Sequence, residues 1–349
     1  EFPVMVSLCQ IIVFAKVKNF YISVLLYACC LLLPVTYFIG VKLYDPLLQP
    51  VVFTSRNFIV HNENLCKGSN KVTVMYIYSS VNSSKTRDVI RQTYGNTQFF
   101  KKYNLRTVFV LGRDLDDDNG KTKDHIYKEA ERHGDLLVGD FLDTYRNLSL
   151  KGIVALDFIH KHCKQAQFVI KADDDVLVNT PALLHTLHRF YTRSYRTALG
   201  KIFSDSEALF CLPKAFNKWC VLYSHYNRTY YPPYMFGAGF VLSGDLVKPM
   251  LNASHKVAPF PIDDVYITGL LLEQIPSTSM VDWTEHVTEN TEETLLRLGG
   301  LKSNNTLYFG HGLSNRQILK GWEKLKAVNQ KKGKVKNNIH DVKSSHVFK

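Results

Sequence analysis

The chain has 349 residues, of which 46% are hydrophobic and 12% aromatic, and its formal net charge is +12. This composition is typical of a packed globular protein and excludes a disordered one. The positive charge is concentrated at one end, because residues 320–349 hold nine lysines and two acidic residues, a net +7 of the +12. The remainder is nearly balanced, so the charge does not indicate a nucleic-acid partner. We expect residues 326–349 to form a basic, mobile tail.

The N-terminal region contains a long uncharged stretch, residues 19–41 (NFYISVLLYACCLLLPVTYFIGV). About 20 apolar residues are enough to cross a bilayer as a helix. Lys16 and Lys18 precede the stretch, which favours a cytosolic N-terminus over residues 1–18 and a lumenal remainder. We expect an uncleaved transmembrane signal anchor in the lipid bilayer, followed by a stem over residues 42–65. A buried helix and a cleaved signal peptide are the alternatives.

An alternation of apolar strands and helices begins after this stem. The expected strands are 72–79, 106–112, 135–141 and 168–172, and the expected helices are 86–95, 122–134, 150–163 and 180–191. Short connections between them predict an α/β domain with a mostly parallel sheet that is covered on both faces. Residues from about 200 to 325 are richer in aromatics and loops, but no linker separates them. We therefore expect one lumenal domain over residues 66–325.

Cysteines and glycosylation sequences agree with a lumenal domain. Four cysteines follow the anchor, an even number that is compatible with two disulfides in an oxidising compartment. Three pairings are open among Cys66, Cys163, Cys211 and Cys220. Five Asn-x-Ser/Thr sequences are candidate glycosylation sites: Asn82, Asn147, Asn227, Asn252 and Asn304.

Two acidic triplets occur, in different surroundings. Residues 116–118 lie among glycine and asparagine in GRDLDDDNGK, as a solvated turn would. Residues 173–175 follow FVIKA and precede VLV, so they are expected at the carboxyl end of a buried strand, where open α/β sheets bind ligands. Buried carboxylates need a cation. A divalent metal that grips a diphosphate would satisfy both charges; an ion-pair network with Lys171 or an arginine is the alternative.

Five blocks of the sequence resemble, in order, those of the β-1,3-glycosyltransferase family, which includes β-1,3-galactosyl- and β-1,3-N-acetylglucosaminyltransferases. They lie between residue 66 and about residue 320, and they are TRDVIRQTYG, EAERHGDLLVGDFLDTYRNLSLK, KADDDVLVN, YYPPYMFGAGFVLS and IDDVYITGLLL. The third block resembles the Asp-x-Asp motif of nucleotide-sugar transferases. The chain departs from the family pattern at Tyr94, Ser149, Met235 and Asp263, where Trp, Thr, Cys and Glu are usual.

The resemblance implies a GT-A (Rossmann-like) fold and an enzyme that transfers a sugar from a UDP donor to a glycan acceptor, with inversion and a β-1,3 linkage. It also implies Mn²⁺ or another divalent cation as cofactor and, with the anchor, a type II protein of the Golgi membrane. UDP-galactose is the donor we favour, and the N-acetylglucosamine and N-acetylgalactosamine donors remain open. The oligomeric state is not indicated. A non-catalytic lumenal carbohydrate- or calcium-binding protein is the alternative from another class.

Metal and donor roles follow from this resemblance. Asp175 and His311, in YFGHGL, are the expected metal ligands. Asp173 and Asp174 are expected to hold the ribose and the waters of the metal. Lys171 is placed in the same nucleotide-sugar-binding group.

Inversion requires a base that removes the proton of the acceptor hydroxyl. Asp264 in PIDDVY is the candidate, with Asp263 as a neighbour that contacts substrate. Adjacent carboxylates in an apolar setting raise one pKa, which suits a base near neutral pH. A helix N-terminus, which also favours acidic residues, is the plain alternative.

The remaining candidates are two arginines and an aromatic, glycine-containing segment. Arg87 and Arg91 are four residues apart on one helix face, so both can point at one anion of the donor; salt bridging is the alternative. Tyr234, Gly237 and Gly239 are expected to contact the sugar, by stacking and by close backbone approach, with a structural turn as the alternative.

Two tryptophans follow the anchor at a distance from these blocks. Average burial preference predicts that Trp219 and Trp283 pack in the core and do not contact the acceptor.

Overall fold

The computed structural model describes residues 57–114, 121–210, 218–298 and 306–327. All of them belong to one compact unit that begins at Pro50. The predicted anchor, the cytosolic N-terminus, most of the stem and nearly all of the tail lie outside the described ranges. Within those ranges, no helix is long and apolar enough to cross a bilayer.

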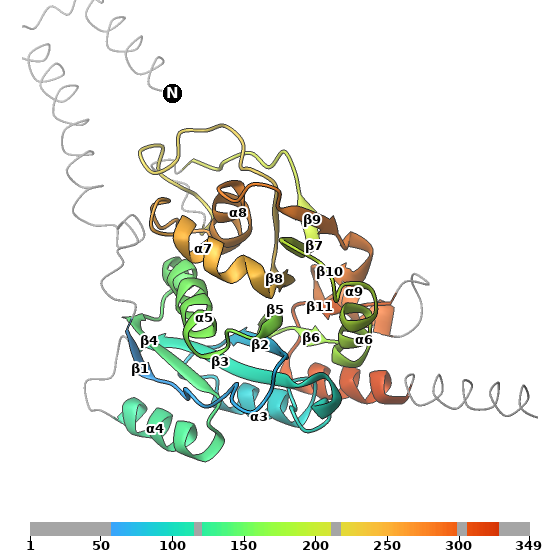
Figure 1. Cartoon of the computed structure of the whole chain (residues 1–349). Helices are drawn as coiled ribbons and strands as arrows, with labels where there is room; N and C mark the ends of the chain where they lie inside the picture. The colour runs from blue at the N-terminus through green and yellow to red at the C-terminus, as the bar shows by residue number, and fades with distance from the viewer. Residues whose placement is uncertain (1–56, 115–120, 211–217, 299–305, 328–349) are drawn as a thin grey trace, which may run out of the picture. The chain divides into compact units, whose positions relative to one another are not determined.

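A mixed sheet with the order β1-β4-β3-β2-β5-β8-β7-β9 forms the centre of the domain (Figure 1). A smaller sheet with the order β10-β11-β6 lies beside it. The strands are β1 (Phe58–Val60), β2 (Val72–Tyr78), β3 (Leu105–Arg113), β4 (Leu136–Leu142), β5 (Ala166–Asp173), β6 (Leu177–Val178), β7 (Thr197–Phe203), β8 (Tyr234–Ser243), β9 (Ser279–Asp282), β10 (Val287–Thr288) and β11 (Phe309–Gly310).

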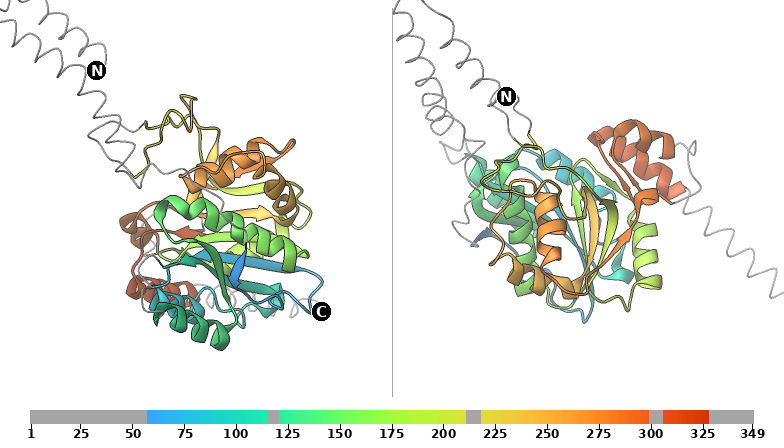
Figure 2. Two further views of the ribbon diagram at one scale, coloured as in Figure 1. Left: turned by 90° about the vertical axis from the view of Figure 1, so that its left-hand side faces the viewer. Right: turned by 90° about the horizontal axis from the view of Figure 1, so that it is seen from above.

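The helices cover both faces of the large sheet (Figure 2). They are α3 (Ser84–Gln92), α4 (Lys121–His133), α5 (Leu148–His162), α6 (Thr180–Phe190), α7 (Val247–Ala253), α8 (Leu271–Glu273) and α9 (Thr291–Leu298), and residues 315–327 are also helical. A π-helical segment, η5 (Val265–Leu270), precedes α8, and short 3-10 segments are η2 (Lys101–Tyr103), η3 (Tyr145–Asn147), η4 (Gly244–Leu246) and η6 (Thr284–His286). The predicted α/β class is confirmed, and each of the eight predicted elements lies within three residues of an observed one at either end.

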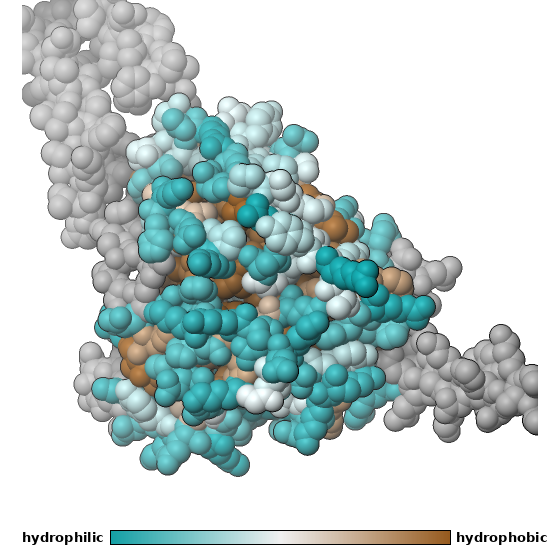
Figure 3. Space-filling view, in the orientation of Figure 1, coloured by the Kyte–Doolittle hydropathy of each residue, from teal (hydrophilic) through white to brown (hydrophobic). Residues whose placement is uncertain are grey.

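Strand β2 shows why this sequence folds between two layers of helices. All seven of its residues are buried, and the side chains alternate between two hydrophobic clusters. Val74 and Tyr76 pack with α5, α7 and α8, whereas Met75 and Ile77 pack with α3, α4 and α6. A strand that is apolar on both faces is stable only when both faces are covered. The apolar side chains of β2 are enclosed, and the face in Figure 3 is mostly hydrophilic with smaller hydrophobic patches.

The change of strand direction at β5 positions the site. Strands β4, β3, β2 and β5 are parallel, as predicted, but β8 pairs antiparallel with β5. In that register Ala172, near the end of β5, lies opposite Gly239, in the middle of β8. The middle of β8 therefore lies beside the last residues of β5. Two segments that are far apart in the sequence thus meet at one edge of the sheet.

A disulfide joins Cys66 to Cys163, with their Cα atoms 5.2 Å apart. It links the segment before β2 to the residue after α5, and it is one of the pairings that the sequence left open. Cys220 is also disulfide-bonded, while Cys211 lies outside the described residues. Trp283 is 4% exposed, as predicted. The same prediction is wrong for Trp219, which is 51% exposed.

Candidate active site

The acidic triplet lies at the carboxyl end of β5, as the flanking apolar runs predicted. Asp173 is the last residue of β5 and pairs in register with Tyr78, the last residue of β2. A tight turn follows, in which the Val176 amide donates to the Asp173 carbonyl at 3.3 Å. Val176 is fully buried. Apolar residues on both sides thus fix three charged side chains at the sheet edge where α/β proteins bind ligands.

Each carboxylate of the triplet has its own partner. The Lys171 ammonium lies 2.6 Å from Asp173, the Ser79 hydroxyl donates to Asp174 at 2.9 Å, and the His311 Nε2 lies 3.4 Å from Asp175. Burial raises the pKa of Asp173 to about 6, against the attraction of Lys171. Burial also raises the pKa of Asp174. For Asp175 burial is opposed by the hydrogen bond with His311, and the net effect lowers the pKa of its carboxyl.

Asp175 and His311 are the two side chains suited to a divalent cation. One carboxylate oxygen of Asp175, Oδ1, is buried and has no hydrogen-bond partner among the described residues. The His311 Nδ1 is 2.6 Å from the Glu289 carbonyl, which can only accept a hydrogen bond. Nδ1 therefore carries a proton, and the lone pair of the neutral imidazole is on Nε2, facing Asp175. The hydrogen bond with Asp175 raises the pKa of His311, so a proton and a cation compete for Nε2.

These observations fit a metal with few protein ligands. In the described ranges no group of three or more His, Cys, Asp or Glu side chains is arranged to hold an ion. A cation between Asp175 and His311 would have two protein ligands and take the others from phosphate oxygens and water, an arrangement typical of nucleotide-bound metals.

Asp263 and Asp264 precede the π-helical segment η5. The Asp264 carboxylate accepts a hydrogen bond from the Val265 amide at 2.9 Å, so the helix N-terminus interpretation is correct. Burial, and then the neighbouring Asp263, raise the pKa of Asp264 to about 7. Burial also raises the pKa of Asp263. Asp264 is thus both a helix cap and a carboxyl group that ionises near neutral pH, as expected of a base.

Two glycines of β8 have different functions in packing. A Cβ added to Gly237 would lie 3.0 Å from the Cβ of Asp264, so the absence of a side chain lets Asp264 lie against β8. A Cβ added to Gly239 would overlap the ring of Phe309. Gly239 therefore accommodates Phe309 of β11, the strand that leads to His311. This packing explains Gly239 without the sugar contact that the sequence predicted.

Lys171 is an internal counter-ion. Its side chain is 1% exposed, and its ammonium also donates to the Gly237 carbonyl and lies 4.3 Å from the centre of the Tyr78 ring. Burial lowers the pKa of Lys171, but Asp173 and Asp263 outweigh it and the net shift is upward. The ion-pair alternative therefore describes Lys171 better than a direct contact with a nucleotide.

Tyr234 is half-buried and packs on Phe203, with ring centres 5.5 Å apart.

Arg87 and Arg91 share Glu129 of α4. Arg87 is fully buried, and its Nη2 lies 2.6 Å from Glu129. Arg91 bonds Glu129 at 2.7 Å and Asp135 at 2.8 Å. Burial opposes ionisation of Glu129, but the two arginines lower its pKa overall. These contacts are those of the salt-bridge alternative, although the pairs are largely buried.

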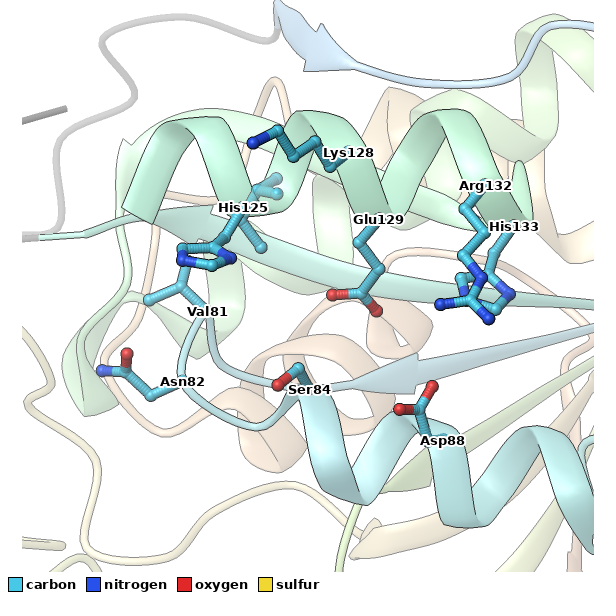
Figure 4. Close-up of a pocket in the computed structure, with 10 residues that line it drawn as sticks. Val81, Asn82, Ser84, Asp88, His125, Lys128, Glu129, Arg132 and His133 are labelled. Carbon is cyan, nitrogen blue, oxygen red and sulfur yellow. The ribbon is translucent and has the colours of Figure 1, made fainter. Parts of the chain in front are cut away.

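The site receives indirect support from Arg87. Its Nη1 donates to the Ser79 hydroxyl at 3.2 Å, and this hydroxyl donates to Asp174. Glu129 also faces a hollow of about 430 Å³ between α3 and α4, shown in Figure 4. None of the residues that line this hollow belongs to the acidic triplet or to the Asp263–Asp264 pair.

Comparison with known proteins identifies the family. The sequence profile described as Galactosyltransferase matches residues 85–279, more than half of the chain. The chain belongs to the galactosyltransferase family. It is 34% identical to human beta-1,3-galactosyltransferase 5 over 219 residues. These residues make up 63% of this chain and 68% of that protein. The chain is 28% identical over 278 residues to mouse UDP-GalNAc:beta-1,3-N-acetylgalactosaminyltransferase 1, covering 79% and 80% of the two chains.

The resemblance to β-1,3-glycosyltransferases is confirmed by these relatives, and the chain is an enzyme of the glycosyltransferase class. Among solved structures, the galactosyltransferase LgtC in complex with donor and acceptor sugar analogs is similar at a TM-score of 0.34 and 9% identity, covering 73% of this chain and 96% of that one. The WbbM bifunctional glycosyltransferase is similar at a TM-score of 0.39 and 9% identity, covering 73% and 50%.

Sequence reasoning missed two buried cations among the described residues of this galactosyltransferase domain, Arg146 and Lys151. Lys151 of α5 is 3% exposed, forms an ion pair with Asp143 at 2.7 Å and donates to the Ser79 carbonyl at 2.7 Å. It therefore holds the segment whose hydroxyl contacts Asp174. A lysine near the start of the apolar helix sequence LKGIVALDFI is the signal that could have indicated it.

Removal of the Arg87 guanidinium should destabilise this domain. We expect Arg87→Met to lower the free energy of unfolding by about 3–5 kcal/mol, because Glu129 would keep a partly buried charge with one partner fewer. Arg113→Met is the control, since the Arg113–Asp140 pair is 50% and 37% exposed and such pairs contribute about 0–1 kcal/mol. Thermal unfolding followed by circular dichroism measures both. Equal midpoints for the two variants would contradict a structural role for the Arg87–Glu129 pair.

Alanine at the two β8 glycines should separate catalysis from packing. We expect Gly237→Ala to lower the transfer rate roughly tenfold or more by displacing the candidate base Asp264, since small misplacements of a catalytic group have large effects. Gly239→Ala should instead lower the free energy of unfolding by about 1–3 kcal/mol, because Phe309 must move. Rate constants and thermal midpoints measured on both variants give the comparison. If Gly237→Ala leaves the transfer rate unchanged, close packing at Gly237 does not position Asp264 for transfer.

Proposed function

We propose that this galactosyltransferase-family enzyme transfers a hexose from a UDP-sugar to a hydroxyl group of a glycan, with inversion at the anomeric carbon and formation of a β-1,3 linkage. UDP-galactose is the donor we favour, because the family profile and the human relative are both described as galactosyltransferases. The acceptor would be a glycan on a protein or a lipid. The GT-A form of the α/β fold is part of this proposal.

One observation supports the proposal above the others: two different carboxylate sites lie in the same electrostatic neighbourhood. The Lys171 ammonium joins Asp173 to the Gly237 carbonyl, beside Asp264, and Asp263 is among the charges that raise the pKa of Asp173. The first site, Asp175 with His311, has an unpaired carboxylate oxygen for a cation among the described residues. The second, Asp264, has a carboxyl pKa of about 7. A donor site and a base are the two things that an inverting transfer needs.

The residues then have separate tasks. Asp175 and His311 would hold a divalent ion such as Mn²⁺, which would supply positive charge to stabilise the departing diphosphate. Asp264 takes the proton from the acceptor hydroxyl as the oxygen forms its bond to the anomeric carbon. The bond from that carbon to UDP breaks on the opposite face. Asp174, positioned by Ser79, is suited to accept hydrogen bonds from the ribose or from water on the metal.

A transfer assay of the full chain tests this function. UDP-galactose, UDP-N-acetylglucosamine and UDP-N-acetylgalactosamine are each supplied with a panel of methyl β-glycosides, with Mn²⁺ or with EDTA. We expect transfer from UDP-galactose in Mn²⁺ and none in EDTA. Transfer from UDP-N-acetylgalactosamine is the second candidate, because the mouse relative is named for that donor. If no donor gave either transfer or UDP-sugar hydrolysis, the result would support a non-catalytic binding protein instead.

The cellular setting is part of the same proposal. We infer a type II protein of the Golgi membrane, anchored by residues 19–41, with the domain in the lumen. The disulfide between Cys66 and Cys163 supports an oxidising compartment.

A further inference from the structure

Two large aromatic side chains are exposed near the candidate base. Trp219 is 51% exposed and Tyr145 is 43% exposed. Tyr145 belongs to η3, and Trp219 lies in the long connection between β7 and β8, whose described residues, 204–210 and 218–233, extend beyond the sheet near α7 and α8 (Figure 1). Tryptophan is highly buried on average, and aromatic residues are enriched where a protein surface contacts a partner or ligand.

Several contacts hold the two rings in place. The Lys218 ammonium lies 4.6 Å from the centre of the Trp219 ring and 5.3 Å from the centre of the Tyr145 ring. A side-chain hydrogen bond links Trp219 and Tyr145, and the indole N–H must be its donor because it cannot accept. Arg146 donates to the Cys220 carbonyl at 2.9 Å. Because these contacts join η3 to the β7–β8 connection, the rings are positioned before any ligand arrives.

The rings lie on the Asp264 side of the site. Four residues after Tyr145, the Ser149 hydroxyl donates to the Phe260 carbonyl, three residues before Asp263. Burial raises the pKa of Tyr145 to about 12, and the next contributions come from Asp263 and Asp264. The Ser149–Phe260 hydrogen bond joins the helix that follows η3 to the segment before Asp263, and with these charge interactions it places Tyr145, and the Trp219 bonded to it, on the side of the candidate base.

We propose that Trp219 and Tyr145 form the acceptor subsite, a platform on which a neutral pyranose ring of the acceptor stacks through its C–H face while its hydroxyl points at Asp264. The proposal rests on the proposed function, because it assigns the second substrate of that reaction. A rigid aromatic surface binds an amphipathic ring with little loss of conformational entropy. Lys218 occupies part of the rings and orients them, and the remaining exposed surface is available to the sugar.

The test compares the kinetics of Trp219→Ala with those of the wild type, using the full chain, UDP-galactose, Mn²⁺ and the methyl β-glycoside that gives the highest wild-type rate. We expect the KM for the glycoside to rise about fivefold to tenfold, as loss of one aromatic stacking contact predicts. The KM for UDP-galactose and the slow hydrolysis of UDP-galactose without acceptor should stay within about twofold. Trp219→Phe should restore most of the acceptor affinity.

Tyr195→Ala is the matched control, because Tyr195 is 65% exposed, lies between α6 and β7 and also contacts a cationic side chain. It should leave both KM values unchanged. The inference is overturned if Trp219→Ala binds the acceptor as the wild type does, or if hydrolysis and the donor KM change as much as the acceptor KM. By contrast, a wild-type chain that neither transfers nor hydrolyses any UDP-sugar would overturn the proposed function itself.

Discussion

Asp264→Asn is expected to lower the transfer rate constant by at least about 100-fold, within the range of about 10²–10⁴ that general base catalysis contributes. The amide cannot take a proton from the acceptor hydroxyl. It can still accept the hydrogen bond that the Val265 amide donates to Asp264, so the start of η5 should be preserved. Steady-state kinetics measure the rate, and calorimetric titration with UDP and Mn²⁺ shows whether donor binding is retained. Asp88→Asn, at a carboxylate that is 54% exposed, is the control and should transfer normally.

The pH dependence adds a second signature to the same prediction. Because the pKa of Asp264 is raised to about 7, the base is protonated below that pH, and the wild-type kcat/KM should fall about tenfold per unit below pH 7. Because folding raises the pKa of Asp264, this carboxyl group contributes stability at low pH, and that contribution is lost as pH rises through its pKa in the folded state. Asparagine does not ionise, so Asp264→Asn avoids this loss of stability. The variant should therefore unfold at an equal or higher temperature than the wild type at pH 8. A variant that transfers sugar at the wild-type rate would remove Asp264 from the mechanism.

Removal of the divalent cation is the other change with a large expected effect. We expect EDTA to abolish transfer and Mn²⁺ to restore it, because a bound ion contributes several kcal/mol to stabilising charge on a leaving diphosphate. Asp175→Asn should lower the rate by about 100-fold or more at a Mn²⁺ concentration that saturates the wild type. Electron paramagnetic resonance of Mn²⁺ with UDP measures the loss of binding directly.

The second acidic triplet offers a control for the metal experiment. Asp117→Asn makes the same chemical change in the sequence GRDLDDDNGK, and we expect it to leave both Mn²⁺ binding and transfer unchanged. Transfer by the EDTA-treated wild type at its full rate would contradict metal dependence. So would an Asp175→Asn variant that binds Mn²⁺ as tightly as the wild type.

The position of the triplet and the central strands followed from the sequence for a local reason. Runs such as FVIKA are apolar on both faces, and only a covered strand accommodates them. Three carboxylates directly after such a run must therefore lie where the strand ends, at the side of the sheet formed by the carboxyl ends of its parallel strands. The antiparallel direction of β8 had no comparable local signal. It depends on how the chain returns to the sheet after α6, β7 and the long connection that follows β7.

The arginines show where local spacing was not enough. The four-residue separation correctly placed Arg87 and Arg91 on one face of a helix. Their partner, Glu129, belongs to another helix, α4, and the spacing contains no information about which anion that face meets. The two glycines of β8 show the same limit, because Asp264 and Phe309 reach them from later segments. For Trp219, average burial predicts a core position, whereas its exposure depends on the path of the β7–β8 connection.

The covalent link between Cys66 and Cys163 has a practical consequence for every experiment above. It closes a loop with a sequence separation of 97 residues, and a cross-link of about that length stabilises a folded chain by roughly 4–5 kcal/mol in the chain-entropy model. That figure is comparable with the whole stability of many domains. A recombinant host that keeps thiols reduced would therefore yield enzyme that loses activity whatever its catalytic residues are. Variants should be compared only between batches whose free-thiol content has been shown to match.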